Sequence, residues 1–376
     1  AVLRQVAPFP PYEPTWAYET YTFGTLLGAP HVMLGVALTL LALLLYWQAG
    51  GGSTAGMVGL LLAVVGLGLV HPFNLPTLLA IWWLHAALSW WSGEGRRRVV
   101  VAALAAVASL PALLQHVATF LADPFWSSVY GAQNRLPSPA IEALPIEYGL
   151  LLPLAIASVP SLWRRGTEGR YLVLCTAVIL VAIYLPVPFQ RRLGLGLHPL
   201  LALAAGVALA QAVDSLPRGA RRLALVTVFV LACSSTGLVL AAAVASALTG
   251  SPLPIYRVTD GEARAARWLA ARAAEDAVVL ASWDTGNYLA GRLAGRVVGG
   301  HPVATLHPEE KRARIEAFFT GEALERADIV CDLGVTHLFV GRRERLLAGD
   351  HVDESPWMKR IYGEGDVAIY EVRCER

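Results

Sequence analysis

Charged residues are scarce in this sequence, and most of them lie after residue 250. Of the 376 residues, 15% are charged and 56% are hydrophobic, whereas a typical soluble domain has about 25% charged residues. The mean hydropathy is +0.53. These values exclude an ordinary soluble protein and indicate a membrane protein.

Cysteine is also scarce, with four residues in the whole chain. Cys175 and Cys233 lie in apolar runs, whereas Cys331 and Cys374 lie in the polar C-terminal part. No pair has the Cys-x-x-Cys spacing, so neither a zinc site nor a dithiol redox site is predicted. A disulfide between Cys331 and Cys374 is an option that the sequence alone leaves open.

The distribution of charge divides the chain near Gly250. Residues 1–250 hold 8 of the 28 acidic and 13 of the 30 basic residues, and residues 251–376 hold the other 20 and 17. Neither part has the strong basic excess of a nucleic-acid binder, so no nucleic acid is expected as a partner. We therefore predict three parts: an interfacial segment at 1–30, a transmembrane helical bundle at 31–250 and an α/β domain at 251–376.

The beginning of the chain predicts neither a span nor a signal peptide. Residues 1–30 are rich in proline and aromatic residues, which is typical of a segment at a membrane surface. The first residue is Ala1. We expect the true N-terminus to lie upstream of Ala1, so that part of the functional machinery would lie there too.

Apolar runs between residues 31 and 250 predict about eight transmembrane helices. The runs are separated by turns or charged loops. They cover residues 31–48, 55–70, 73–91, 99–122, 147–163, 171–189, 193–213 and 223–248.

The arginines predict the orientation of this bundle, because positively charged loops face the cytoplasm. Loops 92–98, 164–170 and 214–222 together hold nine arginines. The opposite side, apart from the last domain, has four basic residues: Arg4, Arg135, Arg191 and Arg192. We therefore expect a multi-pass protein of the cell (inner) membrane with its C-terminal domain outside the cytoplasm. The lipid membrane is thus one expected partner.

Six polar residues are predicted to lie near the outer ends of the spans. They are Glu19, His31, His71, Gln190, Arg191 and Arg192. Because guanidinium groups bind phosphate oxygens in a bidentate manner, the two arginines predict a phosphate-binding site. Gln190 and the two histidines are further candidate ligands. Glu19 is the candidate catalytic carboxylate, as a base or a metal ligand.

Other interpretations of these residues stay open. The arginines can instead snorkel to lipid head groups, or pair with Glu19 or Glu147 in a structural bridge. His31 and His71 can equally be helix-end histidines that are hydrogen-bonded to the backbone.

The polar C-terminal part has the pattern of a soluble α/β domain. Thr259-x-x-Glu262 is a capping box that opens a helix. Further helices are expected at 284–293, 308–319 and 322–333. Strands are expected at 277–281, 297–298 and 336–340, with an edge strand at 366–373.

Polar residues follow the first three of these strands. If the strands are parallel, their carboxyl ends bring Asp284, His301 and Arg342 to one edge, where open α/β sheets bind ligands. Asp284 and His301 are therefore candidate substrate-binding residues. The alternative is that Asp284 only caps a helix and the arginines are solvated.

Several short stretches are similar to bacterial membrane glycosyltransferases of the GT-C class. The resemblance covers most of the chain, although each stretch is short. The stretches are Tyr18-Glu19-x-x-Thr22-Phe23, Pro30-His31, His71-Pro72-Phe73, Phe189-Gln190-Arg191-Arg192, Gly286-Asn287-Tyr288, Gly300-His301-Pro302 and Gly365-Asp366-Val367-Ala368-Ile369-Tyr370.

A further stretch, Trp283-Asp284-x-Gly286, resembles part of the WWDYG signature of the oligosaccharyltransferase catalytic subunit. Ser282 replaces its first Trp and Thr285 replaces its Tyr, so recognition of an acceptor sequon is not implied.

The resemblance implies a hexosyltransferase that moves a sugar from a polyprenyl-phosphate carrier to an extracytoplasmic glycan, lipid or protein. It implies that Arg191 and Arg192 hold the carrier phosphate. The main acidic residue of this class lies in the first extracytoplasmic loop, which here would precede Ala1 and would leave Glu19 as a second carboxylate. Whether a divalent metal ion serves as cofactor is left open.

Two other functions fit the same sequence. One is a transporter or flippase for a lipid-linked or anionic substrate, for which His198-Pro199 and Pro153 are the only hints of a broken helix. The other is a non-catalytic membrane protein whose outer domain binds a glycan or a protein partner.

Overall fold

The computed structural model describes residues 30–93, 95–131, 135, 137–249, 258–301, 304–321, 323–348 and 356–374. The chain separates into two compact units between Ala241 and Ala242, close to the predicted boundary. Glu19 and the predicted segment 1–30, apart from Pro30, lie outside the described residues.

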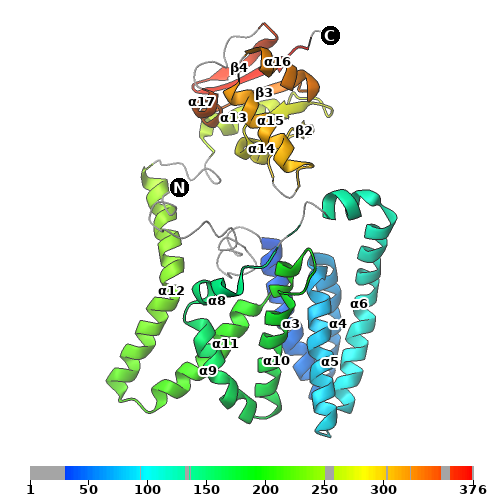
Figure 1. Ribbon diagram of the computed structural model, residues 1–376, viewed down its shortest axis with the longest axis vertical. Helices are drawn as coiled ribbons and strands as arrows, with labels where there is room; N and C mark the ends of the chain where they lie inside the picture. The colour runs from blue at the N-terminus through cyan, green and yellow to red at the C-terminus, as the bar shows by residue number, and fades with distance from the viewer. Residues whose placement is uncertain are drawn as a thin grey trace. The chain divides into compact units, whose positions relative to one another are not determined.

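The first unit consists of antiparallel helices joined mostly by short connections (Figure 1). Each of the eight predicted apolar segments forms a helix. The long helices are α3 (Pro30–Gly50), α4 (Thr54–Val70), α5 (Leu75–Trp91), α6 (Arg96–Ala122), α9 (Leu151–Arg164), α10 (Thr167–Ala182), α11 (Leu197–Asp214) and α12 (Arg218–Thr249). The short ones are η2 (Pro72–Asn74), η3 (Phe125–Tyr130), η4 (Ile141–Ala143), α8 (Leu144–Tyr148) and η5 (Gln190–Gly194).

Fewer of these helices are clear membrane spans than the eight predicted. Within the described residues, three are long and apolar enough to cross a membrane: His31–Gly50, Arg96–Ala122 and Gln190–Asp214. Helices α5, α9 and α10 have 17, 14 and 16 residues. At 1.5 Å per residue such helices are about 21 to 26 Å long, less than the roughly 30 Å of a bilayer core. The prediction of eight spans is therefore too high by this measure.

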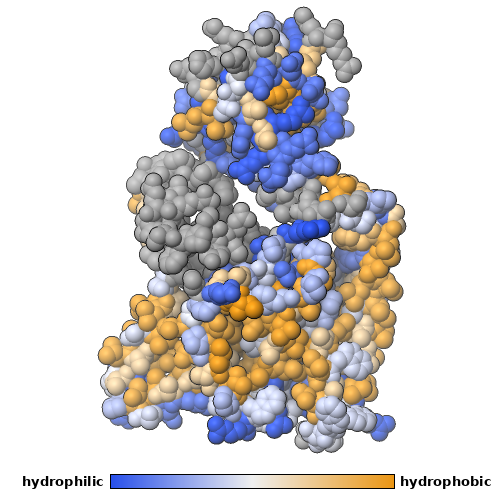
Figure 2. Space-filling model, in the orientation of Figure 1, coloured by the Kyte–Doolittle hydropathy of each residue, from blue (hydrophilic) through white to orange (hydrophobic). Residues whose placement is uncertain are grey.

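The helices are apolar on their outer as well as their inner faces. Leu60, Leu67 and Ile81 are fully buried, yet Leu69 and Leu121 are 80% and 81% exposed. Figure 2 shows apolar residues over much of the visible helical surface. A helix that is hydrophobic all round is typical of a core or a membrane rather than of a water-facing surface.

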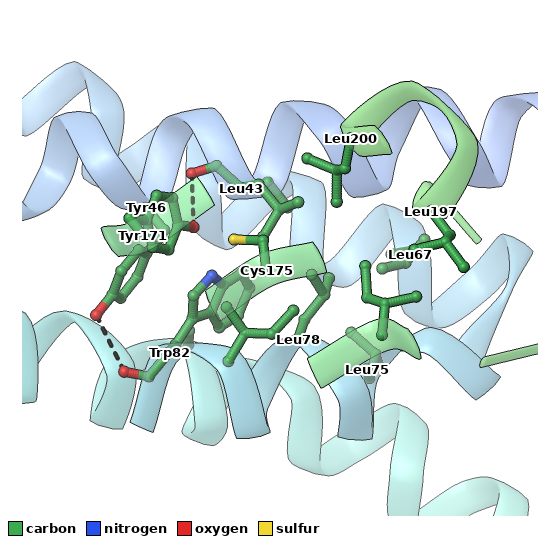
Figure 3. Packing of buried hydrophobic residues seen from close by; sticks show 14 of the residues in the cluster. Leu43, Tyr46, Leu67, Leu75, Leu78, Trp82, Tyr171, Cys175, Leu197 and Leu200 are labelled. Carbon is green, nitrogen blue, oxygen red and sulfur yellow. Dashed lines mark hydrogen bonds between the residues drawn. The ribbon is translucent and has the colours of Figure 1, made fainter. Parts of the chain in front are cut away.

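A cluster of aromatic side chains joins α3, α5 and α10 inside this unit (Figure 3). Tyr46 stacks on Trp82 with ring centroids 5.4 Å apart and donates a hydrogen bond to its carbonyl oxygen, at 3.1 Å. Tyr171 donates to the Leu43 carbonyl oxygen at 3.0 Å. His85 Nδ1 lies 3.3 Å from the Tyr46 hydroxyl. These bonds fix α5 and α10 against α3.

The two ends of the helical unit differ in composition. One end carries the three arginine-rich loops. There the Arg97 side chain donates to the Ala49 carbonyl oxygen at 2.8 Å, and the Arg98 guanidinium lies 5.3 Å from the centre of a Trp47 ring. The opposite end holds the start of α3 and the end of α10. The short helices η2, η5 and α8 lie there (Figure 1).

The second unit is built around a five-stranded mixed sheet of order β2-β1-β3-β5-β4. Strand β1 is parallel to β2 and β3, and β5 is antiparallel to β3 and β4. The strands are β1 (Val278–Leu280), β2 (Arg296–Val297), β3 (His337–Val340), β4 (Met358–Glu364) and β5 (Val367–Val372). The helices are α13 (Asp260–Ala270), α14 (Trp283–Ala290), α15 (Pro308–Thr320), α16 (Ala323–Asp332) and α17 (Arg342–Ala348).

Most of this domain follows the sequence prediction. The Thr259–Glu262 capping box forms at the start of α13, and the three parallel strands lie where they were expected. Strand β4 was not predicted. Because it pairs with β5, the strand at 367–372 lies inside the sheet, and its prediction as an edge strand was wrong. A disulfide joins Cys331 to Cys374 with their Cα atoms 5.6 Å apart, and thereby ties the end of α16 to the chain beyond β5.

Candidate functional site

The predicted arginine pair lies on η5, a short turn between α10 and α11. Pro186 and Pro188 follow α10, and proline removes the backbone donor that a continuing helix needs. The chain therefore turns at Gln190–Gly194. Arg191 and Arg192 are both half-buried, while Leu193 and Leu195 are buried and anchor the turn.

Arg192 is held against η2 by an aromatic ring. Its guanidinium carbon lies 4.8 Å from the centre of the Phe73 ring, within the range of a cation–π contact. Phe73 also packs on Phe189, with centroids 5.0 Å apart. The turns that carry His71 and the arginine pair, 120 residues apart in sequence, therefore meet at one end of the helical unit.

His71 lies beside this contact and is neutral at physiological pH. Its ring makes an edge contact with Phe73 at 5.7 Å and the residue is 6% exposed. Burial, and to a smaller degree the charges of Arg192 and His31, lower the pKa of His71 to about 4. Its Nδ1 atom has no hydrogen-bond partner among the described residues. His31 begins α3 and is exposed.

Asn74 is a buried polar residue that the sequence analysis missed. Its amide nitrogen donates to the Thr39 hydroxyl at 2.7 Å and to the Leu195 carbonyl oxygen at 3.4 Å. Its Oδ1 atom is buried without a partner in the part of the chain that the structure describes. Asn74 thereby joins α3, η2 and the chain after η5. The signal for it was an amide between two apolar residues, Phe73 and Leu75.

Gln190 uses its side chain to hold neighbouring backbone. In the orientation that satisfies both groups, the amide nitrogen donates to the Leu185 carbonyl oxygen at 2.8 Å and the amide oxygen accepts from the Ser138 N–H at 3.0 Å. Its predicted role in substrate binding stays a prediction, and its polar atoms already support η5.

Glu147 is the carboxylate that the structure brings to this end. It lies on α8, is 7% exposed, and neither of its oxygens has a hydrogen-bond partner within the described ranges. Burial raises the pKa of Glu147 to about 7, although the charge of Arg191 acts in the opposite direction. The sequence suggested Glu147 only as a bridging partner of the arginines. We call His71, Asn74, Glu147, Arg191 and Arg192 the rim site.

The rim site contains no recognisable metal centre. Among the residues that the structure describes, no group of three or more His, Cys, Asp or Glu side chains could hold a metal ion. Whether a divalent metal ion takes part is left open, as it was by the sequence.

In the second unit, the loops after β1 and β3 meet at the edge that the sequence predicted. Asp284 is the second residue of α14, whose N-cap position is Ser282, so Asp284 does not occupy the cap itself. The Asp284 carboxylate lies 3.5 Å from Arg343 Nη1 in α17.

A buried carboxylate, Glu344, bridges the chain after β1 and the chain after β3. Strands β2 and β3 lie on opposite sides of β1, so the carboxyl ends of β1 and β3 form the switch point where open α/β sheets bind ligands. Glu344 accepts from the Ser282 N–H at 2.9 Å and from the Gly341 N–H at 2.8 Å. The protein's own carboxylate thus occupies donors that could hold a ligand's phosphate.

His301 follows β2 and is exposed. Its Nδ1 accepts from the Ala304 N–H at 3.1 Å. The chain before it approaches the backbone of α14 so closely that a Cβ atom on Gly286 would collide with the Gly299 carbonyl oxygen. Ligand binding by Asp284 and His301 stays a prediction.

Comparison with known proteins adds no assignment. No protein-family model matches the sequence, and no curated protein shows significant similarity to it. The resemblance to GT-C glycosyltransferases therefore stays a prediction that depends on the short sequence stretches.

Proposed function

We propose that this protein is a membrane glycosyltransferase that moves a sugar from a polyprenyl-phosphate carrier to an extracytoplasmic acceptor at the rim site. One observation carries the proposal: two arginines on one short turn share an end of the helical unit with a buried carboxylate, Glu147, and a neutral histidine, His71.

The charges of the rim site suit a glycosyl phosphate. Arg191 and Arg192 supply cationic donors for the phosphate oxygens. Glu147 and Asn74 contribute buried oxygens that lack partners within the described part of the chain, and buried acceptors of this kind are satisfied by hydroxyl donors. A sugar linked to phosphate carries both groups. As the sugar–phosphate bond breaks, the arginines stabilise the charge that develops on the departing phosphate.

Two further features favour a lipid carrier in a membrane with the C-terminal domain outside the cytoplasm. Within the described residues, three helices have the length and composition of membrane spans, and the arginine-rich loops gather at the end opposite the rim site. The Cys331–Cys374 disulfide is typical of a domain in an oxidising compartment.

The second unit supports a lipid-linked rather than a nucleotide-linked donor. In an α/β domain that binds a nucleotide, the backbone donors at the switch point hold phosphate. Here Glu344 takes the Ser282 and Gly341 N–H groups. A second anion at that position would be repelled.

The test uses the purified full chain in detergent. Undecaprenyl-phosphate-linked mannose and glucose, tritium-labelled in the sugar, are the donors, and farnesyl phosphate is a soluble probe of phosphate binding. We expect the wild-type protein to release undecaprenyl phosphate and to bind farnesyl phosphate. The double variant Arg191→Ala with Arg192→Ala should lose about 100-fold or more in both, since each charged hydrogen bond contributes roughly 1.5 to 3 kcal/mol.

A matched double variant controls for the removal of two charges. Arg164→Ala with Arg165→Ala removes an adjacent pair that ends α9 in an arginine-rich loop, and we expect both activities to be retained. A wild-type protein that neither consumes a donor nor binds farnesyl phosphate would contradict the proposal. So would equal losses in the two double variants.

One observation favours the transporter as a second candidate. His85 Nε2 and Trp82 Nε1, both buried among apolar helices, have no hydrogen-bond partner in the described residues, and unpaired polar atoms inside a membrane bundle often line a transport path. Proteoliposomes distinguish the two functions. A transporter would move an intact fluorescent polyprenyl-phosphate sugar between leaflets, whereas a transferase would cleave it.

A further inference from the structure

Glu147 lies in a position that phosphate binding alone does not explain. Helix α8 has five residues and ends at Gly149, whose φ of +48° a glycine adopts without strain. This turn leads from α8 into α9. Glu147 is buried, whereas Pro145 and Leu150, on either side of it, are exposed.

A purely structural role would give Glu147 different properties. A carboxylate that only fixed Arg191 in an ion pair would be stabilised in its ionised form, and its pKa would fall. Instead, burial outweighs the attraction of Arg191 and raises the pKa of Glu147 to about 7. A structural carboxylate would also accept hydrogen bonds, as Glu344 does, but both Glu147 oxygens lack partners among the described residues.

The titratable groups around Glu147 come from four elements. Arg191 on η5 is the charged group that lowers the pKa of Glu147, against the larger effect of burial. Tyr184, just after α10, interacts electrostatically with Glu147 and with Glu142 of η4. Its hydroxyl group donates a hydrogen bond to the Pro139 carbonyl oxygen at 3.1 Å. His198 of α11 lies against Tyr148, with ring centroids 6.4 Å apart. Among the described residues, Glu147 is therefore the buried carboxylate on which the charge of Arg191 acts.

We propose that Glu147 is the general base of the sugar transfer, the group that takes the proton from the hydroxyl of the acceptor. This inference rests on the proposed function and deepens it. The acceptor oxygen forms a bond to the anomeric carbon while the bond from that carbon to the phosphate oxygen breaks. The electron pair of the broken bond leaves with the phosphate, whose charge Arg191 and Arg192 stabilise, and the acceptor proton moves to a Glu147 oxygen. Water then removes that proton.

The role of Glu147 predicts a pH dependence of turnover. A base with a pKa near the working pH combines adequate ionisation with adequate proton affinity. Because the ionised form is the active one, turnover at saturating donor should rise about tenfold per pH unit below pH 7 and level off above it. The phosphodiester of the donor stays singly ionised over this pH range, so it adds no further transition to the pH profile of turnover.

The test compares Glu147→Gln and Glu147→Asp with the wild-type protein in detergent. The probes are tritium-labelled undecaprenyl-phosphate mannose and glucose with water as acceptor, and farnesyl phosphate for binding. Glutamine keeps the shape and removes the proton acceptor. We expect Glu147→Gln to lower turnover about 100-fold or more, to remove the ionisation near pH 7, and to leave the farnesyl phosphate affinity within about threefold. Glu147→Asp should recover part of the turnover with its pH step. Glu142→Gln, which changes an exposed carboxylate on η4, is the matched control and should behave as wild type.

The outcomes separate this inference from the proposed function. If the wild-type protein turns over donor and Glu147→Gln does so equally fast, Glu147 is not the base but the transferase proposal stands. If Glu147→Gln loses farnesyl phosphate binding and melting temperature together with turnover, its role is structural and the inference is wrong. If the wild-type protein shows neither binding nor turnover, the proposed function fails and the inference with it.

Discussion

The Arg192 guanidinium lies 4.8 Å from the centre of the Phe73 ring, and this contact joins two turns that are far apart in sequence. The ring orients the cation and shields one of its faces from solvent. The affinity for phosphate should therefore depend on Phe73, although its side chain has no hydrogen-bond donor.

Replacing Phe73 with leucine tests that dependence. A cation–π contact contributes about 0.5 to 2 kcal/mol, so Phe73→Leu should weaken the binding of farnesyl phosphate about 3-fold to 30-fold, measured by titration calorimetry. Phe229→Leu, on the exposed surface of α12, should leave the affinity unchanged. Equal affinities for all three proteins would show that the ring does not position Arg192.

The buried neutral state of His71 predicts acid sensitivity. In the unfolded chain its pKa returns to about 6.5, above the folded value of about 4, so the unfolded state binds more protons between these values. The free energy of unfolding should fall by about 3 kcal/mol as the pH drops from 7 to 4. Thermal unfolding in detergent, followed by tryptophan fluorescence, measures the effect.

His71→Gln should flatten this pH profile, because glutamine does not titrate. His116→Gln, which changes an exposed histidine on α6, should retain the wild-type slope. An unchanged slope in His71→Gln would mean that other groups cause the acid sensitivity.

Glu344 predicts a local loss of stability in the second unit. Glu344→Ala leaves the Ser282 and Gly341 N–H groups without their acceptor, and each buried orphan costs about 1 to 3 kcal/mol. Hydrogen exchange should become faster at residues 278–282 and 337–341, the strands whose ends Glu344 joins. The control is Glu316→Ala, which removes an exposed i,i+4 ion pair with Arg312 and should cost no more than about 0.5 kcal/mol. Equal hydrogen-exchange rates in both variants would show that Glu344 does not hold the ends of β1 and β3 together.

The Cys331–Cys374 disulfide predicts that its removal lowers the stability of the second unit and that this unit lies in an oxidising compartment. Cys331 and Cys374 are separated by 43 positions, and closing a loop of this length contributes about 4 kcal/mol in the chain-entropy model. Cys331→Ser with Cys374→Ser should make the second unit markedly more sensitive to proteolysis. Mass spectrometry of alkylated protein purified from membranes should find both wild-type cysteines unlabelled before reduction. Full labelling without reductant would argue against an oxidising compartment.

The helical segments could be predicted because each is an apolar run bounded by polar, glycine or proline residues. Their lengths as spans were overestimated, since α5, α9 and α10 stop at 17, 14 and 16 residues. Strand β4 was missed for a different reason. Lys359 and Arg360 are exposed on it, so an edge strand paired only with β5 lacks the apolar alternation that identifies a half-buried strand.

The rim site was predicted in part. The arginine pair and His71 were identified because charged and imidazole side chains stand out at the ends of apolar runs, and the structure brings these residues together. Asn74 and Glu147 were missed as site residues, because their burial depends on how η2 and α8 pack against distant helices. No local pattern distinguishes a buried glutamate in Pro-Ile-Glu-Tyr from a solvated one.

The close approach of Gly286 to Gly299 has a mechanical consequence for the second unit. Neither Gly286 nor Gly300 has room for a Cβ atom, because the backbone of the other loop occupies that space. Helix α14, which carries Asp284, and the loop that carries His301 therefore meet backbone to backbone, with no side chain between them. A movement of either segment toward the other is therefore opposed by backbone atoms, which cannot rotate aside as a side chain can.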